Sequence, residues 1–377
     1  MKHPPVFALC FFTILTAGAA DALLPDNLAA LFRPPAEYAG DFGDFRSPLT
    51  FEDGSEVKNP ADWTRRREEI RSRWTRRLGE WPPVIERPEV EILATEDRGT
   101  FTQHTVRFLW TPKEKTTGYL LIPEGASATD RRAAVVTVYY EPETAIGRGN
   151  ELRDFAYQLT KRGFVTLSIG TKEASEAKTY ALYWPSMENV GVQPLSMLGY
   201  AAANAFHVLA NRPEVDEERI GITGHSFGGK WSMFASCLYD KFACAAWSDP
   251  GIVFDDTRPS INYWEPWYLG WHPQPWRKRG MASPDNPIRG LYPELRKEGL
   301  DLHELHALMA PRPFFVSGGS EDTPARWKAL NHSIAVNRVL GSENRVGMHN
   351  RPAHPPTPES NEAIYAFFAH FLRQTAP

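Results

Sequence analysis

The spacing of apolar residues changes from helical to strand-like along the chain. Between residues 61 and 79, apolar side chains recur at helical spacing among arginines and glutamates, which predicts an amphipathic helix. From residue 89 onward, short apolar runs of strand length replace this pattern. The run at 133–140 is apolar and rich in β-branched residues, which is typical of a strand covered on both faces.

Strand-like and helix-like segments then alternate to the end of the chain, and this alternation predicts an α/β fold with a doubly wound, mostly parallel sheet. The predicted strands are 90–94, 102–109, 118–122, 133–140, 164–169, 219–223, 242–248, 313–317 and 345–348. The predicted helices are 150–162, 195–210, one starting at 227, 301–309, 324–340 and 359–373.

The first residues differ from the rest of the chain. Lys2 and His3 precede an apolar run at 6–16, and small residues follow it, which is the pattern of a signal peptide over 1–20. The run is too short to span a bilayer, and no later segment is long enough. We therefore expect export to the periplasm or the extracellular space, and no membrane span.

Two further parts are predicted after this leader. Residues 21–88 form an N-terminal arm and the amphipathic helix, and 89–377 form one α/β domain. A stretch rich in Pro and Trp at 250–300 breaks the alternation, and we expect it to be a cap over the site rather than a separate domain.

Composition narrows the classes of function. The chain has 377 residues, 42% of them hydrophobic and 23% charged, which excludes a disordered protein. The formal net charge of −4 argues against nucleic acid as a partner. After removal of the leader only Cys237 and Cys244 remain, too few for a disulfide framework or a four-ligand zinc site. The sequence predicts no metal and no cofactor, and it leaves open the oligomeric state and a bond between these two cysteines.

The chemistry centres on one turn. Gly224-His225-Ser226-Phe227-Gly228 follows a predicted strand and precedes a predicted helix, the context of the nucleophile elbow of an α/β-hydrolase. Ser226 is therefore the candidate nucleophile. The backbone N–H groups of Phe227 and of Tyr140, which follows an earlier strand, are the candidate oxyanion donors.

A serine nucleophile needs a base and an acid, which in this fold follow in the order serine, acid, histidine. His354 lies in the loop after the last predicted strand and is our preferred base, with His349 as the alternative. Asp322 follows the strand before and is our preferred acid. The alternative acids are Asp249, Glu321 and Glu265.

Three segments resemble exported carbohydrate esterases, above all the glucuronoyl esterases and, more distantly, the acetyl xylan esterases. The resemblance covers roughly residues 90–375 and is strongest in GITGHSFGGKWSMFASCLYDKFACAAWSDPG, HELHALMAPRPFFVSGGSEDTP and RVGMHNRPAHPPTPESNEAIYAFFAHFL. It implies the same nucleophile, base and acid, and it implies that Lys230 contacts sugar hydroxyls. Phe227 stands where the glucuronoyl esterases usually have an arginine.

The cap insertion is consistent with a sugar ligand. Trp264, Glu265, Trp267 and Trp271 combine flat apolar rings with a polar group, and we expect them to bind substrate. The alternative is that the rings pack the cap onto the body of the protein.

These observations predict an exported serine esterase that hydrolyses an acetyl or uronoyl ester on a carbohydrate through an acyl-enzyme. One alternative is a serine peptidase of the prolyl oligopeptidase type, although fewer residues precede the first strand than a gating propeller would need. The other is a polysaccharide-binding relative without catalysis.

Overall fold

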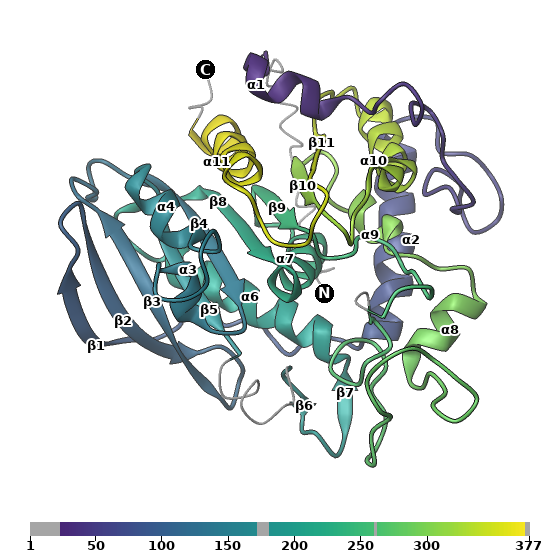
Figure 1. Ribbon diagram of the computed structural model, residues 1–377, viewed down its shortest axis with the longest axis horizontal. Coiled ribbons are helices and arrows are strands. Elements are labelled where there is room, and N and C mark those ends of the chain that lie inside the picture. Colours follow the sequence, from purple (N-terminus) through teal and green to yellow (C-terminus); the bar gives the residue numbers. More distant parts are fainter. Residues whose placement is uncertain (1–22, 172–180, 260–261, 374–377) are drawn as a thin grey trace, which may run out of the picture.

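The computed structural model describes residues 23–171, 181–259 and 262–373 (Figure 1). The predicted signal peptide lies outside the described residues. Within them, nine strands form one sheet in the order β1-β2-β3-β5-β4-β8-β9-β10-β11. These strands are β1 Val90–Asp97, β2 Phe101–Leu109, β3 Lys115–Pro123, β4 Arg132–Tyr139, β5 Val165–Gly170, β8 Val215–His225, β9 Cys244–Ser248, β10 Phe314–Gly318 and β11 Val346–Asn350.

The sheet is antiparallel at one end and parallel over the rest. Strands β1, β2, β3 and β5 pair antiparallel, and every pair from β5 through β4 to β11 is parallel. The predicted α/β class with a mostly parallel sheet is confirmed. A separate pair of short strands, β6 Trp184–Pro185 and β7 Val190–Val192, lies outside this sheet.

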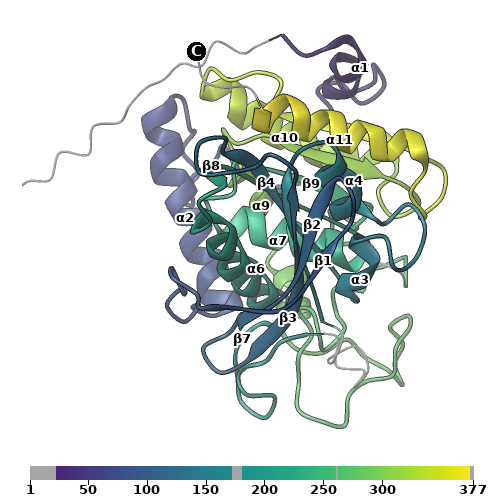
Figure 2. The same ribbon diagram turned by 90° about the vertical axis from the view of Figure 1, so that its left-hand side faces the viewer.

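Helices cover both faces of the sheet, as the two views show (Figures 1 and 2). The longer helices are α2 Pro60–Leu78, α6 Pro194–Ala210, α7 Phe227–Leu238, α10 Trp327–Val339 and α11 Pro358–Arg373. The shorter ones are α1 Asp26–Ala29, η1 Ala30–Phe32, α3 Pro142–Ala145, α4 Phe155–Lys161, α8 Leu291–Lys297, α9 His303–Ala307 and η2 Pro324–Arg326. The helix predicted over 150–162 is thus limited to 155–161.

Strand β4 shows why the sheet has two packed faces. Ala133 and Val135 belong to the cluster formed with α4 and α11, whereas Val136 and Val138 belong to the cluster formed with α2, α6 and α7. Successive side chains of a strand point to opposite faces, so an apolar run is needed when both faces are covered. The uniform run at 133–140 is therefore explained by burial on both sides.

Helix α2 docks on the domain through its apolar side and through buried charge. Asn59 caps its N-terminus by accepting a hydrogen bond from the N–H of Asp62. Trp74 is fully buried, and Arg73 forms a buried ion pair of 2.6 Å with Glu304 of α9. The predicted helix at 61–79 is confirmed.

The arm between η1 and α2 is tied to the domain by neutral imidazoles. The Nε2 atom of His303 lies 2.6 Å from the carbonyl oxygen of Arg46, and that of His332 lies 3.0 Å from the carbonyl oxygen of Phe42. Each ring nitrogen must donate, since a carbonyl only accepts. Burial lowers the pKa of both His303 and His332 to about 4.

These two histidines predict a loss of stability in acid. The unfolded chain binds a proton at each imidazole below about pH 6.5, well before the folded chain does, so stability falls as the pH drops from about 6.5 to about 4. For His303 the difference corresponds to roughly 3 kcal/mol. In urea unfolding at several pH values, His303→Gln is expected to show a shallower decline than the wild type. Parallel declines in the two proteins would contradict the assignment.

Within the predicted cap at 250–300, the described residues form loops and one helix, α8, and they lie with β6 and β7 at one edge of the molecule (Figures 1 and 2). Among the described residues, we find no helix that combines the length and the apolar character needed to span a bilayer.

Candidate active site

Ser226 lies on a sharp turn between β8 and α7. Its backbone has φ 57° and ψ −115°, a strained conformation for a residue with a side chain. A Cβ atom at Gly228 would lie 2.0 Å from the carbonyl oxygen of Val138, so only glycine fits there. The glycine lets the turn rest directly against the end of β4, and this contact places Ser226 at the carboxyl edge of the sheet.

Ser226 and His354 are hydrogen-bonded, and the relay continues to Asp249. The Oγ atom of Ser226 lies 2.8 Å from Nε2 of His354, and Nδ1 of His354 lies 2.7 Å from Oδ2 of Asp249. A carboxylate only accepts hydrogen bonds, so the proton of the neutral ring is on Nδ1 and Nε2 accepts from the serine hydroxyl. The structure thus brings together the predicted serine and histidine.

The preferred acid was wrong: Asp322 does not contact His354. Its two carboxylate oxygens accept hydrogen bonds from the N–H groups of Gly251 (2.8 Å) and Ile252 (2.6 Å). The position next to the imidazole is taken by Asp249, which follows β9 rather than β10. Asp249 was one of the sequence-level alternatives.

Asp249 is held by the loop that carries Asp322. Its Oδ1 atom accepts from the N–H groups of Gly319 (2.6 Å), Glu321 (3.1 Å) and Asp322 (2.9 Å), which leaves Oδ2 for the imidazole. A Cβ atom at Gly319 would lie 2.6 Å from Oδ2, so the glycine makes room for the carboxylate. The two loops therefore bind each other reciprocally, each through its own aspartate.

The carboxylates of Asp249 and Asp322 also interact electrostatically. Burial and then the charge of Asp249 raise the pKa of Asp322. The buried His225 lies beside the base of the relay, with its ring centroid 4.7 Å from that of His354. Burial lowers the pKa of His225 well below its usual value, so this ring adds no positive charge near the relay.

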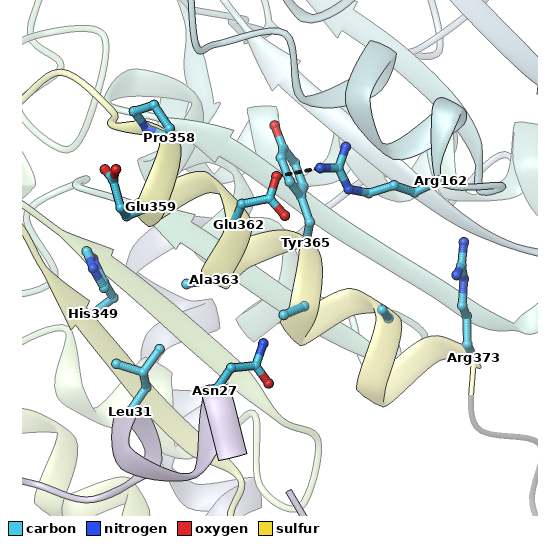
Figure 3. A pocket seen from close by; sticks show the side chains of 12 residues that line it. Asn27, Leu31, Arg162, His349, Pro358, Glu359, Glu362, Ala363, Tyr365 and Arg373 are labelled. Carbon is cyan, nitrogen blue, oxygen red and sulfur yellow. Dashed lines mark hydrogen bonds and ion pairs between the residues drawn. The ribbon is translucent and has the colours of Figure 1, made fainter. Parts of the chain in front are cut away.

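The alternative base, His349, lies elsewhere. It lines a groove of about 710 Å³ beside α11, together with residues of α1 and η1 (Figure 3). Glu359 lies near it, and neither Ser226 nor His354 lines this groove. The geometry favours His354 over His349.

One candidate oxyanion donor, Phe227, directly follows Ser226, and the other, Tyr140, directly follows β4. Phe227 is the first residue of α7, where a backbone N–H has no acceptor in a preceding turn. The rings of Phe227 and Tyr140 stack with centroids 4.4 Å apart at an interplanar angle of 12°. This stack ties the loop after β4 to the start of α7.

The chain is similar in fold to several solved structures. A glucuronoyl esterase from Solibacter usitatus is 17% identical, with a TM-score of 0.67 over 88% of this chain and 98% of that one. A carbohydrate esterase family 15 glucuronoyl esterase from Caldicellulosiruptor kristjansonii is 20% identical, with a TM-score of 0.60 over 89% and 92%. A putative acetyl xylan esterase from Bacteroides fragilis is 16% identical, with a TM-score of 0.55 over 85% and 79%. The chain has the α/β-hydrolase fold.

Sequence comparison adds a partial match. Residues 202–323, which include the turn at Ser226, match the prolyl oligopeptidase family. No sequence among the curated proteins matches the chain. The predicted resemblance to α/β-hydrolases is confirmed at the level of the fold.

Lys230 lies one turn into α7 and is buried. Its ammonium lies 5.1 Å from the ring centroid of Tyr263 and 5.5 Å from that of Tyr268, both from the cap segment. Burial lowers the pKa of Lys230 to about 8. The cation is thus held against aromatic faces close to the elbow.

The tryptophans of the predicted cap separate into two groups by their burial. Trp264 is fully buried and packs edge-on against Tyr292, so its ring faces are covered and it cannot serve as an exposed sugar platform. For this residue the packing alternative fits the structure. Trp267 and Trp271 remain partly exposed.

Glu265 is buried without a hydrogen-bond partner for either carboxylate oxygen among the described residues. Arg277 forms an ion pair with it, since the Nη1 atom of Arg277 lies 3.8 Å from Oε2 of Glu265. Burial raises the pKa of Glu265 to about 7. A buried carboxyl group whose ion pair spans 3.8 Å is costly, so a polar ligand that donated a hydrogen bond to it would bind favourably.

Proposed function

We propose that this chain is a serine hydrolase that cleaves an ester on a carbohydrate. The observation that carries the proposal is the continuous hydrogen-bonded relay from Ser226 through His354 to Asp249. A serine is a weak nucleophile unless an adjacent base takes its proton, and this geometry supplies that base.

The relay supports acyl transfer in two steps. His354 takes the proton of Ser226 as its Oγ attacks the ester carbonyl, and Asp249 stabilises the imidazolium that forms. The imidazolium then protonates the leaving alcohol, and the acyl-enzyme remains. Water, deprotonated by the same imidazole, releases the acid and restores the serine. The amides of Phe227 and Tyr140 are the proposed oxyanion donors, and each such donor is worth about 10²–10³ in kcat.

The carbohydrate part of the proposal rests on the groups around the elbow. The cation of Lys230 is buried against two tyrosine rings, and the carboxyl group of Glu265 is buried in the predicted cap; such groups suit the hydroxyls and C–H faces of a sugar. Trp267 and Trp271, which are partly exposed, are proposed to contact the same ligand. The names of the structural neighbours, glucuronoyl and acetyl xylan esterases, point to uronoyl or acetyl esters.

We further propose that residues 250–300 act as a cap on a catalytic domain spanning 89–377, and that the leader at 1–20 directs export. Polysaccharide esters are too large to enter a cell, so an exported enzyme would meet its substrate directly.

Lys230 provides a test of sugar binding. Lys230→Met is expected to lower kcat/KM on a sugar ester by about 10–100-fold, since a hydrogen bond from a charged group contributes about 1.5–3 kcal/mol. The loss on p-nitrophenyl acetate, which has no sugar hydroxyl, is expected to be smaller. Equal losses on both substrates, measured by steady-state kinetics, would remove Lys230 from the sugar site.

The proposed substrate class is tested by a screen of the purified protein on methyl glucuronoate, acetylated xylan, p-nitrophenyl acetate and prolyl amides. Turnover of methyl glucuronoate or acetylated xylan is expected. The match of 202–323 to the prolyl oligopeptidase family favours a serine peptidase as the second candidate. Cleavage of the prolyl amides alone would select that candidate and reject the esterase.

A further inference from the structure

Arg351 is a buried arginine in the loop between β11 and α11. Its exposed fraction is only 6%, and all three nitrogens of its guanidinium donate hydrogen bonds. The acceptors are the carbonyls of Ser317 (2.8 Å), Gly318 (3.3 Å), His354 (2.8 Å) and Pro355 (2.8 Å), and the hydroxyls of Ser317 (2.9 Å) and Ser248 (3.4 Å).

These acceptors belong to three separate segments that carry the relay. Ser317 and Gly318 end β10, and Ser248 ends β9 directly before Asp249. The carbonyl oxygen of Ser248 also accepts the N–H of Ser226 at 2.7 Å. His354 itself lies in a loop that is neither helix nor strand. A single guanidinium therefore joins the loop of the base to the strand end that supports both the nucleophile and the acid.

The charge of Arg351 is balanced at a distance. The acceptors of its hydrogen bonds are neutral oxygens, while the carboxylates of Asp249 and Asp322 lie close enough to raise its pKa against the lowering effect of burial. Burying a cation is costly, and a planar guanidinium can meet acceptors in several directions at once. Lysine keeps the charge but carries all its N–H groups on one nitrogen, so it cannot reach this set of acceptors.

We infer that Arg351 is a positioning residue that fixes the backbone of His354 relative to Ser226 and Asp249. This inference rests on the proposed function, because it assumes that these three residues perform the catalysis. Both hydrogen bonds of the imidazole, 2.7 and 2.8 Å, depend on where the His354 loop lies relative to the end of β9. A small displacement of that loop weakens both.

The test compares Arg351→Lys with Arg312→Lys. Arg312 is a matched control because its guanidinium also binds backbone carbonyls, those of Ser236 (3.0 Å) and Phe242 (3.0 Å), but at the end of β9 away from the relay. We expect R351K to lower kcat on the ester that the screen selects by about 10–100-fold with little change in KM, as misplaced catalytic groups do. R312K is expected to lower Tm while kcat stays close to the wild-type value.

A second variant keeps the inference testable if R351K folds poorly. In Arg351→Ala, added guanidinium is expected to restore part of the activity, whereas ammonium is not, because only the planar ion meets the same acceptors. Wild-type kcat in R351K, or equal falls of kcat in R351K and R312K at matched Tm loss, would overturn the inference. Ser226→Ala run in the same assay separates the two proposals: if it loses activity while R351K does not, only the positioning role fails, and if it keeps activity, the proposed function fails as well.

Discussion

Ser226→Ala is expected to lower kcat/KM for an activated ester by about 10⁴–10⁶, in line with triad knockouts in other serine hydrolases. The substitution removes the only atom that can form the acyl-enzyme in the proposed mechanism. The residual rate would come from the oxyanion donors and from substrate binding alone. Hydrolysis of p-nitrophenyl acetate by the purified variant measures the loss, and labelling by a fluorophosphonate probe, which reacts with activated serines, should disappear with it.

Ser232→Ala is the matched control for this experiment. Ser232 is also a buried serine of α7, and its hydroxyl donates to the carbonyl of Gly229 at 3.0 Å rather than to a base. Its loss should leave both the labelling and the turnover near those of the wild type. Undiminished hydrolysis by Ser226→Ala would reject the proposed nucleophile.

Asp249→Asn is expected to lower kcat by about 10⁴-fold, the effect known for the same change in a catalytic triad. The three N–H groups at Oδ1 of Asp249 require an oxygen there, so the amide NH₂ of an asparagine would face His354. The imidazole would then have to accept at Nδ1 and carry its proton on Nε2. In that tautomer it cannot take the proton of Ser226, while the shape of the site stays the same.

Asp322→Asn is the counterpart that distinguishes the two acids. It replaces one of the two oxygens that bind the N–H groups of Gly251 and Ile252, so we expect a lower Tm and a far smaller loss of kcat. Steady-state kinetics and thermal unfolding of both variants show which aspartate is the catalytic acid. A larger kcat loss in Asp322→Asn than in Asp249→Asn would make Asp322 the catalytic acid, as the sequence predicted.

The sequence was sufficient for the parts of the site that depend on local geometry. A strand, a glycine-flanked serine and a helix in succession define the elbow, and the loop after the last strand could be located from the alternation alone. His354 and Ser226 were therefore predictable without knowledge of distant contacts.

The acid could not be selected in the same way, because two loops end at adjacent positions of the sheet. Asp249 and Asp322 both follow apolar strands, and both are fully buried. Only the hydrogen bonds between the loops decide which carboxylate faces the imidazole. The positive φ of 49° at Asp249 is a backbone feature with no mark in the sequence.

The tryptophans of the cap show a second limit of prediction from the sequence. An aromatic residue in an irregular segment has the same sequence signature whether it packs inward or offers its ring to a ligand. Trp264 is covered by the cap itself, whereas Trp267 and Trp271 keep some exposed surface. Burial in a loop depends on how the loop folds back, which no periodic pattern records.

The mutual binding of the segments that carry Asp249 and Asp322 has a consequence for protein engineering. Neither segment keeps its conformation if the other changes length, because each supplies the amide groups that orient the other's carboxylate. Grafting one of them from a homologue would leave both side chains misdirected. Designers who wish to alter this protein should exchange the two turns together and confine length variation to the N-terminal arm.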